Sequence, residues 1–367
     1  MVNSKEFNPS RLKLARERRK MTYKALAEAV GMSSKMMSHY ENSSNEHPPT
    51  ELSISKIAST LKYPVDFFFG DEVEDIDVDT VAFRSMKSMK ANQQNAALGA
   101  GKISLMLNDF FLSNFNKLPV LNVPSFKDVE PEIAAQMLRD AWGLGDRSIR
   151  SVVGLLESNG VRVFSLAENA QEVDAFSFWK GDVPFVLLNT QKSGERGRFD
   201  AAHELGHLVM HRNRETKGRD IEQQADAFAS AFLMPKTAIY AVHSAPFSVS
   251  RVLKLKKLWN VSAMALTHRL KSLGLVTEWQ YRSAMIDLSK MGYRTTEKDG
   301  IERENSVLIP KLLSALADDG IRLPHIASTL GLPIEEVSSL LFKLTVLERN
   351  EKPVRTPITK PKLYIVN

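Results

Sequence analysis

The stretch RFDAAHELGHLVMH (residues 198–211) is the most informative part of the sequence, with three of the eight histidines inside nine residues. On a helix, positions i and i+4 share a face one turn apart, so His203 and His207 can offer their imidazoles to one ion. Glu204 then lies beside that ion, where a carboxylate can take a proton from water. The pattern predicts an HExxH zinc site on a helix.

The alternative for this stretch is a surface helix that carries scattered histidines. The neighbours Phe199, Ala201, Ala202, Leu205 and Leu208 favour a buried helix instead, where unpaired imidazoles and a carboxylate would be costly. His211 is not expected to be a ligand. It lies two turns beyond His203, about 12 Å along the axis at 1.5 Å per residue.

A second helix is predicted in DIEQQADAF (residues 220–228), with Asp220 as its cap and Pro235 at its end. Glu222 can complete a His2Glu site, and Asp226, one turn later, can accept the free N–H of a ligand histidine. The alternative is a solvated acidic face, because carboxylates are usually exposed.

The N-terminal part contains a predicted helix-turn-helix in TYKALAEAVGMSSKMMSHYE (residues 22–41). Thr22 and Ser33 are good N-caps, and Gly31 can adopt the left-handed turn between the two helices. This pattern resembles the XRE, or phage-repressor-like, family over about 60 residues. Tyr23 is a departure, because that family often places a phosphate-clamping glutamine there.

The second helix of this unit is the expected DNA reader. We expect Ser34, Lys35, Ser38 and His39 to face the major groove of duplex DNA, because early residues of a recognition helix and those of its next turn face outward. Basic residues of the preceding helix can attract phosphates, or can form a solvated helix face. They are Arg11, Lys13, Arg16, Arg18, Arg19 and Lys20.

Composition limits the remaining possibilities. The chain has 367 residues, 43% apolar and 25% charged, with no long uncharged apolar run, so we expect a soluble protein of two or three domains. There is no cysteine, which excludes disulfides, Cys-based zinc fingers, iron–sulfur clusters and thiol nucleophiles. The polar N-terminal sequence carries no secretory signal pattern, and we expect a cytoplasmic protein.

Charge and periodicity predict the modules of the chain. Residues 1–70 hold 11 Lys/Arg against 7 Asp/Glu, whereas residues 71–80 hold six acids and no base, which indicates a solvated acidic linker. Helices are expected over 83–118 and 129–158, followed by three short strands in a small, mainly antiparallel sheet. Residues 255–270 and 326–342 repeat the helix-turn-helix rhythm, but many helix pairs do, and we do not count them as DNA sites.

The runs WGLG (142–145), DAFS (174–177), PFVLLN (184–189), RFDAAHELGHLVMH (198–211) and IEQQADAFASAFLMP (221–235) together resemble the ImmA/IrrE family of zinc metallopeptidases, over roughly residues 80 to 275. The resemblance implies that His203, His207 and Glu222 hold Zn2+ and that Glu204 is the catalytic acid/base. Gln224 stands where many relatives have a second acid, a peripheral change. The spacing of Tyr240 and His243 selects neither as the oxyanion-stabilising group.

The sequence therefore predicts a mainly α protein with a small β-sheet (α+β). An all-α helix-turn-helix domain (1–70) is followed by the acidic linker (71–80), a zincin-like, gluzincin-type metallopeptidase domain (81–275) and a helical C-terminal region (276–367). The resemblance implies a DNA-binding regulator, expected as a homodimer, that cleaves a protein substrate of the XRE-repressor type. The alternative is a non-catalytic repressor or antitoxin whose zinc domain is structural or sensory.

Overall fold

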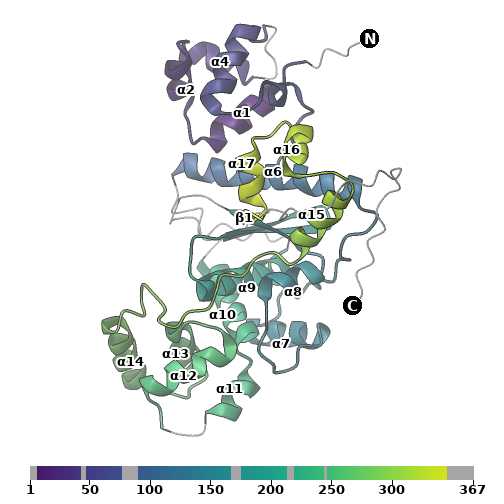
Figure 1. Ribbon diagram of the computed structural model, residues 1–367. Coiled ribbons are helices and arrows are strands. Elements are labelled where there is room, and N and C mark those ends of the chain that lie inside the picture. The colour runs from purple at the N-terminus through teal and green to yellow at the C-terminus, as the bar shows by residue number, and fades with distance from the viewer. Residues whose placement is uncertain are drawn as a thin grey trace.

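The computed structural model describes residues 6–42, 47–76, 90–166, 175–212, 219–243 and 246–344. They form three tiers (Figure 1): the N-terminal helices at one end, a small sheet with its covering helices in the middle, and a helical unit at the other end. The predicted α+β class is confirmed. Within the described segments, no helix combines the length and the apolar character that crossing a bilayer requires.

The first tier is all-helical, as predicted. Its elements are α1 (Pro9–Arg18), α2 (Tyr23–Val30), α3 (Ser34–Tyr40), α4 (Glu51–Leu61) and the 3-10 helix η1 (Val65–Phe69).

The predicted turn between α2 and α3 is present. Thr22 Oγ1 accepts a hydrogen bond from the Ala25 N–H at 3.1 Å, and Ser33 Oγ accepts one from the Met36 N–H at 3.2 Å. Gly31 ends α2 at φ +72°, a left-handed conformation that glycine adopts without a steric penalty. The capping residues therefore set the angle at which α3 leaves α2.

The second tier contains a three-stranded sheet of β1 (Arg162–Leu166), β2 (Ala175–Lys180) and β3 (Val183–Asn189) in the order β1-β3-β2. β2 and β3 form an antiparallel hairpin with Gly181 at φ +56° in its turn. β1 pairs parallel to β3. The prediction of a mainly antiparallel sheet is thus wrong for one of the two strand pairs, because β1 lies on the far side of β3 and is not a neighbour of β2.

Helices cover both faces of the sheet (Figure 1): α6 (Ala91–Asn114) on one side and α9 (Gly194–Met210) on the other. Phe176 and Phe178 face α6, since a Cβ at Gly101 of α6 would lie 3.4–3.5 Å from their rings. Side chains alternate along a strand, so Ser177 between them faces α9. This alternation places one hydroxyl against the HExxH helix.

Further helices complete this tier and the third one. α7 (Pro131–Ala141), α8 (Val152–Ser158) and α10 (Arg219–Leu233) pack around α9, and α11 (Lys236–Val242), α12 (Val249–Trp259), α13 (Ala263–Ser272) and α14 (Glu278–Lys290) form the third tier. Arg269 of α13 makes a bidentate pair with Glu132 of α7, at 2.6 Å to each carboxylate oxygen. The pair joins the third tier to the second.

The C-terminal region is helical, as predicted, with α15 (Leu308–Asp318), α16 (Leu323–Leu330) and α17 (Ile334–Leu340). Glu157 of α8 accepts hydrogen bonds from the N–H groups of Val307 and Leu308 at 2.7 and 2.9 Å, which caps the start of α15. α16 and α17 then return to the first tier and lie between it and the sheet (Figure 1), with α17 against β1.

The start of the predicted acidic linker is docked on the protein. Val73 and Ile76 are buried, while Glu74 pairs with Lys180 at 2.7 Å and Asp75 with Lys102 at 2.5 Å. The four acids of 71–76 are exposed, as the prediction of a solvated segment requires, but Val73 and Ile76 between them are buried and dock the segment on the protein. Residues 77–80 lie outside the described residues, as do 345–367 of the predicted C-terminal region.

Candidate metal centre and DNA interface

The three predicted metal ligands come together, two from α9 and one from α10. One ligand atom each from His203, His207 and Glu222 lies within 4.8 Å of the other two. The two histidine Nε2 atoms are 3.1 Å apart, and Glu222 Oε2 lies 3.3 Å from that of His203 and 3.7 Å from that of His207. Neutral imidazoles and a carboxylate are the donors of a His2Glu zinc site.

A close approach of the two helices allows this convergence. Gly206, one position before His207, faces the buried ring of Phe228 on α10, and a Cβ at Gly206 would lie 3.0 Å from Phe228 Cδ1. A larger side chain at position 206 would push α10 away. Glycine therefore lets the carboxylate of Glu222 reach the histidines.

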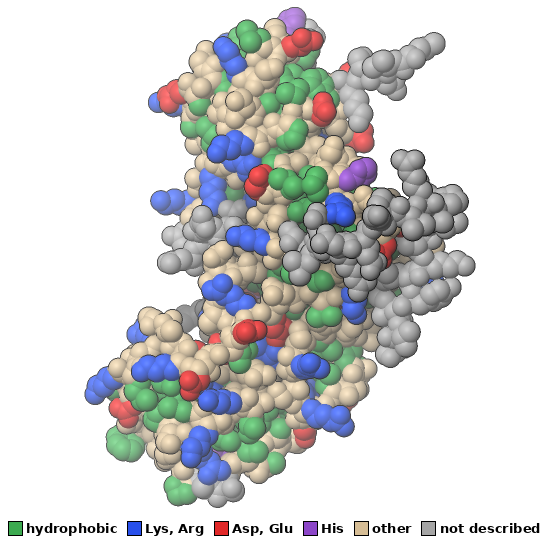
Figure 2. All heavy atoms as spheres, viewed as in Figure 1, with side chains coloured by type: hydrophobic (Ala, Val, Ile, Leu, Met, Phe, Trp, Pro, Cys, Tyr) green, Lys and Arg blue, Asp and Glu red, His purple; other side chains and the backbone are tan. Residues whose placement is uncertain are grey.

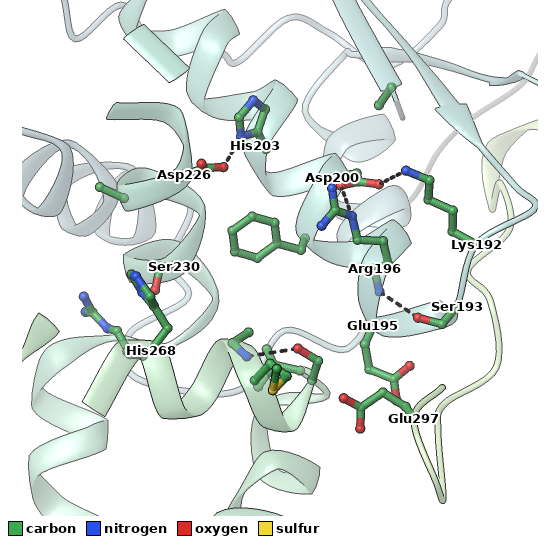
Figure 3. Close-up of a pocket in the computed structure, with 18 of the residues that line it drawn as sticks. Lys192, Ser193, Glu195, Arg196, Asp200, His203, Asp226, Ser230, His268 and Glu297 are labelled. Atoms are coloured by element: carbon green, nitrogen blue, oxygen red, sulfur yellow. Dashed lines mark hydrogen bonds and ion pairs between the residues drawn. The ribbon is translucent and has the colours of Figure 1, made fainter. Parts of the chain in front are cut away.

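Asp226, one turn after Glu222, contacts the outer nitrogen of His203. Its Oδ1 lies 2.9 Å from His203 Nδ1 (Figure 3). A carboxylate oxygen accepts, so Nδ1 carries the proton and Nε2 faces the cluster. The contact predicted for Asp226 is thus present in the geometry.

The electrostatics of the cluster suit a cation. Burial acts to lower the pKa of His203, but the carboxylates of Asp226 and Glu222 outweigh it and raise that pKa to about 10. Burial acts to raise the pKa of Glu222, but the two imidazoles lower it to about 2. The site thus stabilises one positive charge at neutral pH, and a metal ion can replace the proton.

One orphaned atom indicates that the residues present fit a metal. Glu222 Oε2 is buried and lies 3.3 and 3.7 Å from the two imidazole Nε2 atoms, and no hydrogen-bond partner for it is found among the described residues. Buried carboxylate oxygens normally have a partner. A metal ion held by His203, His207 and Glu222 would satisfy this requirement.

Glu204 stands beside the ligands without belonging to them. Its side chain is buried and lines the same cavity. Ser177 Oγ donates a hydrogen bond to Glu204 Oε2 at 2.6 Å from the α9 face of β2. The sequence interpretation missed Ser177, although strand alternation and its place in the DAFS run were available signals.

His211 does not belong to the set of metal ligands, and Tyr240 and His243, considered above as oxyanion-stabilising groups, lie away from it. His211 Nδ1 is 3.0 Å from His207 Nδ1, on the side of that ring that faces away from His203. Tyr240 Oη donates a hydrogen bond to the Leu273 carbonyl at 3.0 Å, and neither Tyr240 nor His243 lines the cavity.

The cluster opens into a cavity of about 1490 Å³ between the second and third tiers. Lys192 and Arg196 flank Asp200 on one wall, and Glu195 lies near Glu297 on the same side (Figure 3). The opposite wall carries Ser230 of α10 and His268 of α13. α13, the second helix of the helix-turn-helix rhythm in 255–270, thus lines this cavity.

Two family models match the chain. Residues 156–271 match the IrrE N-terminal-like domain, Peptidase_M78, and residues 12–68 match the helix-turn-helix family HTH_3. The predicted resemblance is confirmed. A search of the curated proteins found no match. The IrrE N-terminal-like segment contains the whole His203, His207 and Glu222 cluster together with Glu204 and Ser177.

The helix-turn-helix segment presents α3 to solvent. Ser34, Lys35, Ser38 and His39 are all exposed, whereas Met37 and Tyr40 on the same helix are buried. The outer face of α3 therefore carries these polar side chains, of the kind that contact base edges and phosphates, together with the exposed Met36. Tyr23, where the XRE pattern departs, lies under the Arg16 guanidinium at 4.2 Å from its ring centroid.

The arginines of α1 contact the protein itself. Arg11 Nε donates to the Asp71 carbonyl at 2.8 Å, Arg16 pairs with Glu41, and Arg18 and Arg19 pair with Glu336. On the face shown in Figure 2, Lys and Arg side chains are scattered over the first tier and form no continuous patch. These contacts, some with partners distant in sequence such as Glu336, mean that the arginines do not form the solvated helix face of the alternative interpretation. Their attraction of phosphates stays a prediction.

Proposed function

We propose that this chain is a DNA-binding transcriptional regulator with a zinc-dependent endopeptidase domain. The observation that carries the proposal is the position of Glu204. It adjoins three metal-ligand side chains, is held by Ser177, and contributes no ligand atom to the cluster. A site with only a structural metal has no use for such a carboxylate.

The chemistry assigns a separate task to each side chain. His203, His207 and Glu222 would hold the zinc ion, which when bound would supply the Lewis acidity that polarises a scissile carbonyl and lowers the pKa of a water. Glu204 accepts the proton of that water and returns it to the leaving amine. Ser177 fixes the direction in which the Glu204 carboxylate points.

The shape of the cavity favours a polypeptide substrate. Its volume exceeds the usual 300 to roughly 1,000 Å³ of small-molecule pockets. Ala175, which begins the edge strand β2, lines it, and an edge strand can pair with an extended peptide. We propose that the substrate is a repressor of the XRE type, whose cleavage relieves repression under stress or in response to phage or mobile elements.

The DNA-binding activity is assigned to α3. In this proposal Ser34, Lys35, Ser38 and His39 contact duplex DNA in the major groove. A homodimer that binds two half-sites fits this kind of domain, and the cytoplasm is the proposed location because duplex DNA and repressors are found there.

The test is to incubate the zinc-loaded protein with XRE-type repressors encoded near its gene and to identify new peptide termini by mass spectrometry. Cleavage that stops on chelation and returns with zinc supports the proposal. Intact repressors, together with specific DNA binding and bound zinc, would favour the alternative of a non-catalytic repressor or antitoxin with a structural or sensory zinc domain.

A further inference from the structure

His211 and Gln224 form a hydrogen-bonded chain that ends at a ligand histidine. His207 Nδ1 lies 3.0 Å from His211 Nδ1, and His211 Nε2 lies 3.0 Å from Gln224 Oε1. All three side chains are buried or half-buried. The chain joins the end of α9 to α10 on the side of His207 opposite the metal cluster.

The amide oxygen at the end of this chain sets the protonation of both rings. Gln224 Oε1 can only accept, so the proton of neutral His211 is on Nε2. His211 Nδ1 is then a bare acceptor, and the proton of His207 must be on its Nδ1. His207 consequently presents the lone pair of Nε2 to His203 and Glu222.

We propose that His211 and Gln224 are positioning residues that select the zinc-binding tautomer of His207, an inference that rests on the proposed zinc site. Asp226 does the same for His203 through a carboxylate. The two ligand histidines are thus oriented by different groups, one charged and one neutral. Gln224 is not a peripheral substitution, because its carbonyl determines the direction of every hydrogen bond in this chain.

The experiment measures zinc affinity by chelator competition and the His207 tautomer by ¹⁵N NMR of the zinc-loaded protein. Gln224→Met keeps the length of the side chain without the carbonyl and is expected to raise the zinc Kd about 10-fold. His211→Leu removes the acceptor and is expected to raise it about 10- to 100-fold. His211→Asn keeps an acceptor near the position of Nδ1, and we expect it to bind zinc nearly as the wild type does.

Gln136→Met, on α7 outside the cavity lining, is the matched control and should leave zinc affinity unchanged. Thermal unfolding of the metal-free variants shows whether each one is folded. Wild-type affinity and an unchanged His207 tautomer in Gln224→Met would overturn the proposal while leaving the zinc site intact. Equal losses of zinc affinity in His211→Asn and His211→Leu would also overturn the proposal. A wild-type protein that binds no zinc would contradict the site itself.

Discussion

Arg18 on α1 and Glu336 on α17 are 318 residues apart in sequence and form an ion pair in which Arg18 Nε donates to Glu336 Oε1 at 2.6 Å. Arg19 Nη1 donates to the other carboxylate oxygen at 2.8 Å, and Glu336 is buried. The C-terminal helices therefore hold the DNA-binding domain against the peptidase-type domain.

This pair predicts a pH-dependent stability. Burial acts to raise the pKa of Glu336, but Arg18 and Arg19 lower it below its ordinary value of 4.5. A lowered folded-state pKa means that the stabilisation is complete above about pH 4.5 and is lost as the pH falls through the folded-state pKa. Glu336→Gln should thus cost about 3 kcal/mol at pH 7 and progressively less as the pH falls below about 4.5.

Urea unfolding of Glu336→Gln across this pH range measures the effect, with Glu335→Gln as the control because Glu335 is exposed on the same turn. A Glu336→Gln variant as stable as the wild type at pH 7 would show that the pair does not hold the domains together.

Features that depend on residues close together in the sequence could be predicted, whereas those that depend on contacts between distant segments could not. The helix-turn-helix and the HExxH helix follow from local signals: N-caps at Thr22 and Ser33, and ligands one helical turn apart. The parallel pairing of β1 with β3 and the contact of Arg18 with Glu336 could not be predicted, because they depend on which distant segments meet. Ser177 is intermediate, since its strand and the HExxH helix were both predicted but their packing against each other was not.

The hydrogen bond from Ser177 to Glu204 predicts a positional effect on catalysis. Ser177→Ala frees the carboxylate to rotate and should lower kcat about 10- to 100-fold, since a small misplacement of a reacting group has effects of this size. Bound zinc should remain stoichiometric because Ser177 is not a ligand. Steady-state kinetics and metal analysis of the same sample distinguish a lower kcat with zinc retained from a lower kcat caused by loss of zinc. A variant with wild-type kcat would exclude this role for Ser177.

Asp226 offers a prediction about metal affinity. Asp226→Leu removes the acceptor from His203 Nδ1 and should raise the zinc Kd about 10- to 100-fold. Asp226→Asn keeps an acceptor oxygen, and its zinc Kd should rise less than that of Asp226→Leu. Chelator competition gives both constants, and the opposite order of the two variants would contradict the contact seen at 2.9 Å.

The exposed residues of α3 and α1 should differ in their effects on DNA binding. Lys35→Ala or Ser38→Ala should change sequence preference, since both side chains lie on the outer face of α3. Lys13→Ala on α1 should weaken all sequences and lower the salt slope by about 1, as expected for one lost phosphate contact. Binding to a selected operator and to random duplex over several salt concentrations tests this, and no DNA affinity at low salt would reject α3 as a reader.

Glu204 is the proposed general base of a zinc peptidase, and measuring zinc content and cleavage together in Glu204→Gln tests this role most directly. An amide cannot accept the proton of water, so we predict one zinc per chain and no detectable cleavage of a substrate that the wild type cuts. His203→Ala/His207→Ala should lose both zinc and cleavage. Cleavage by Glu204→Gln at the wild-type rate, with zinc bound, would contradict the account.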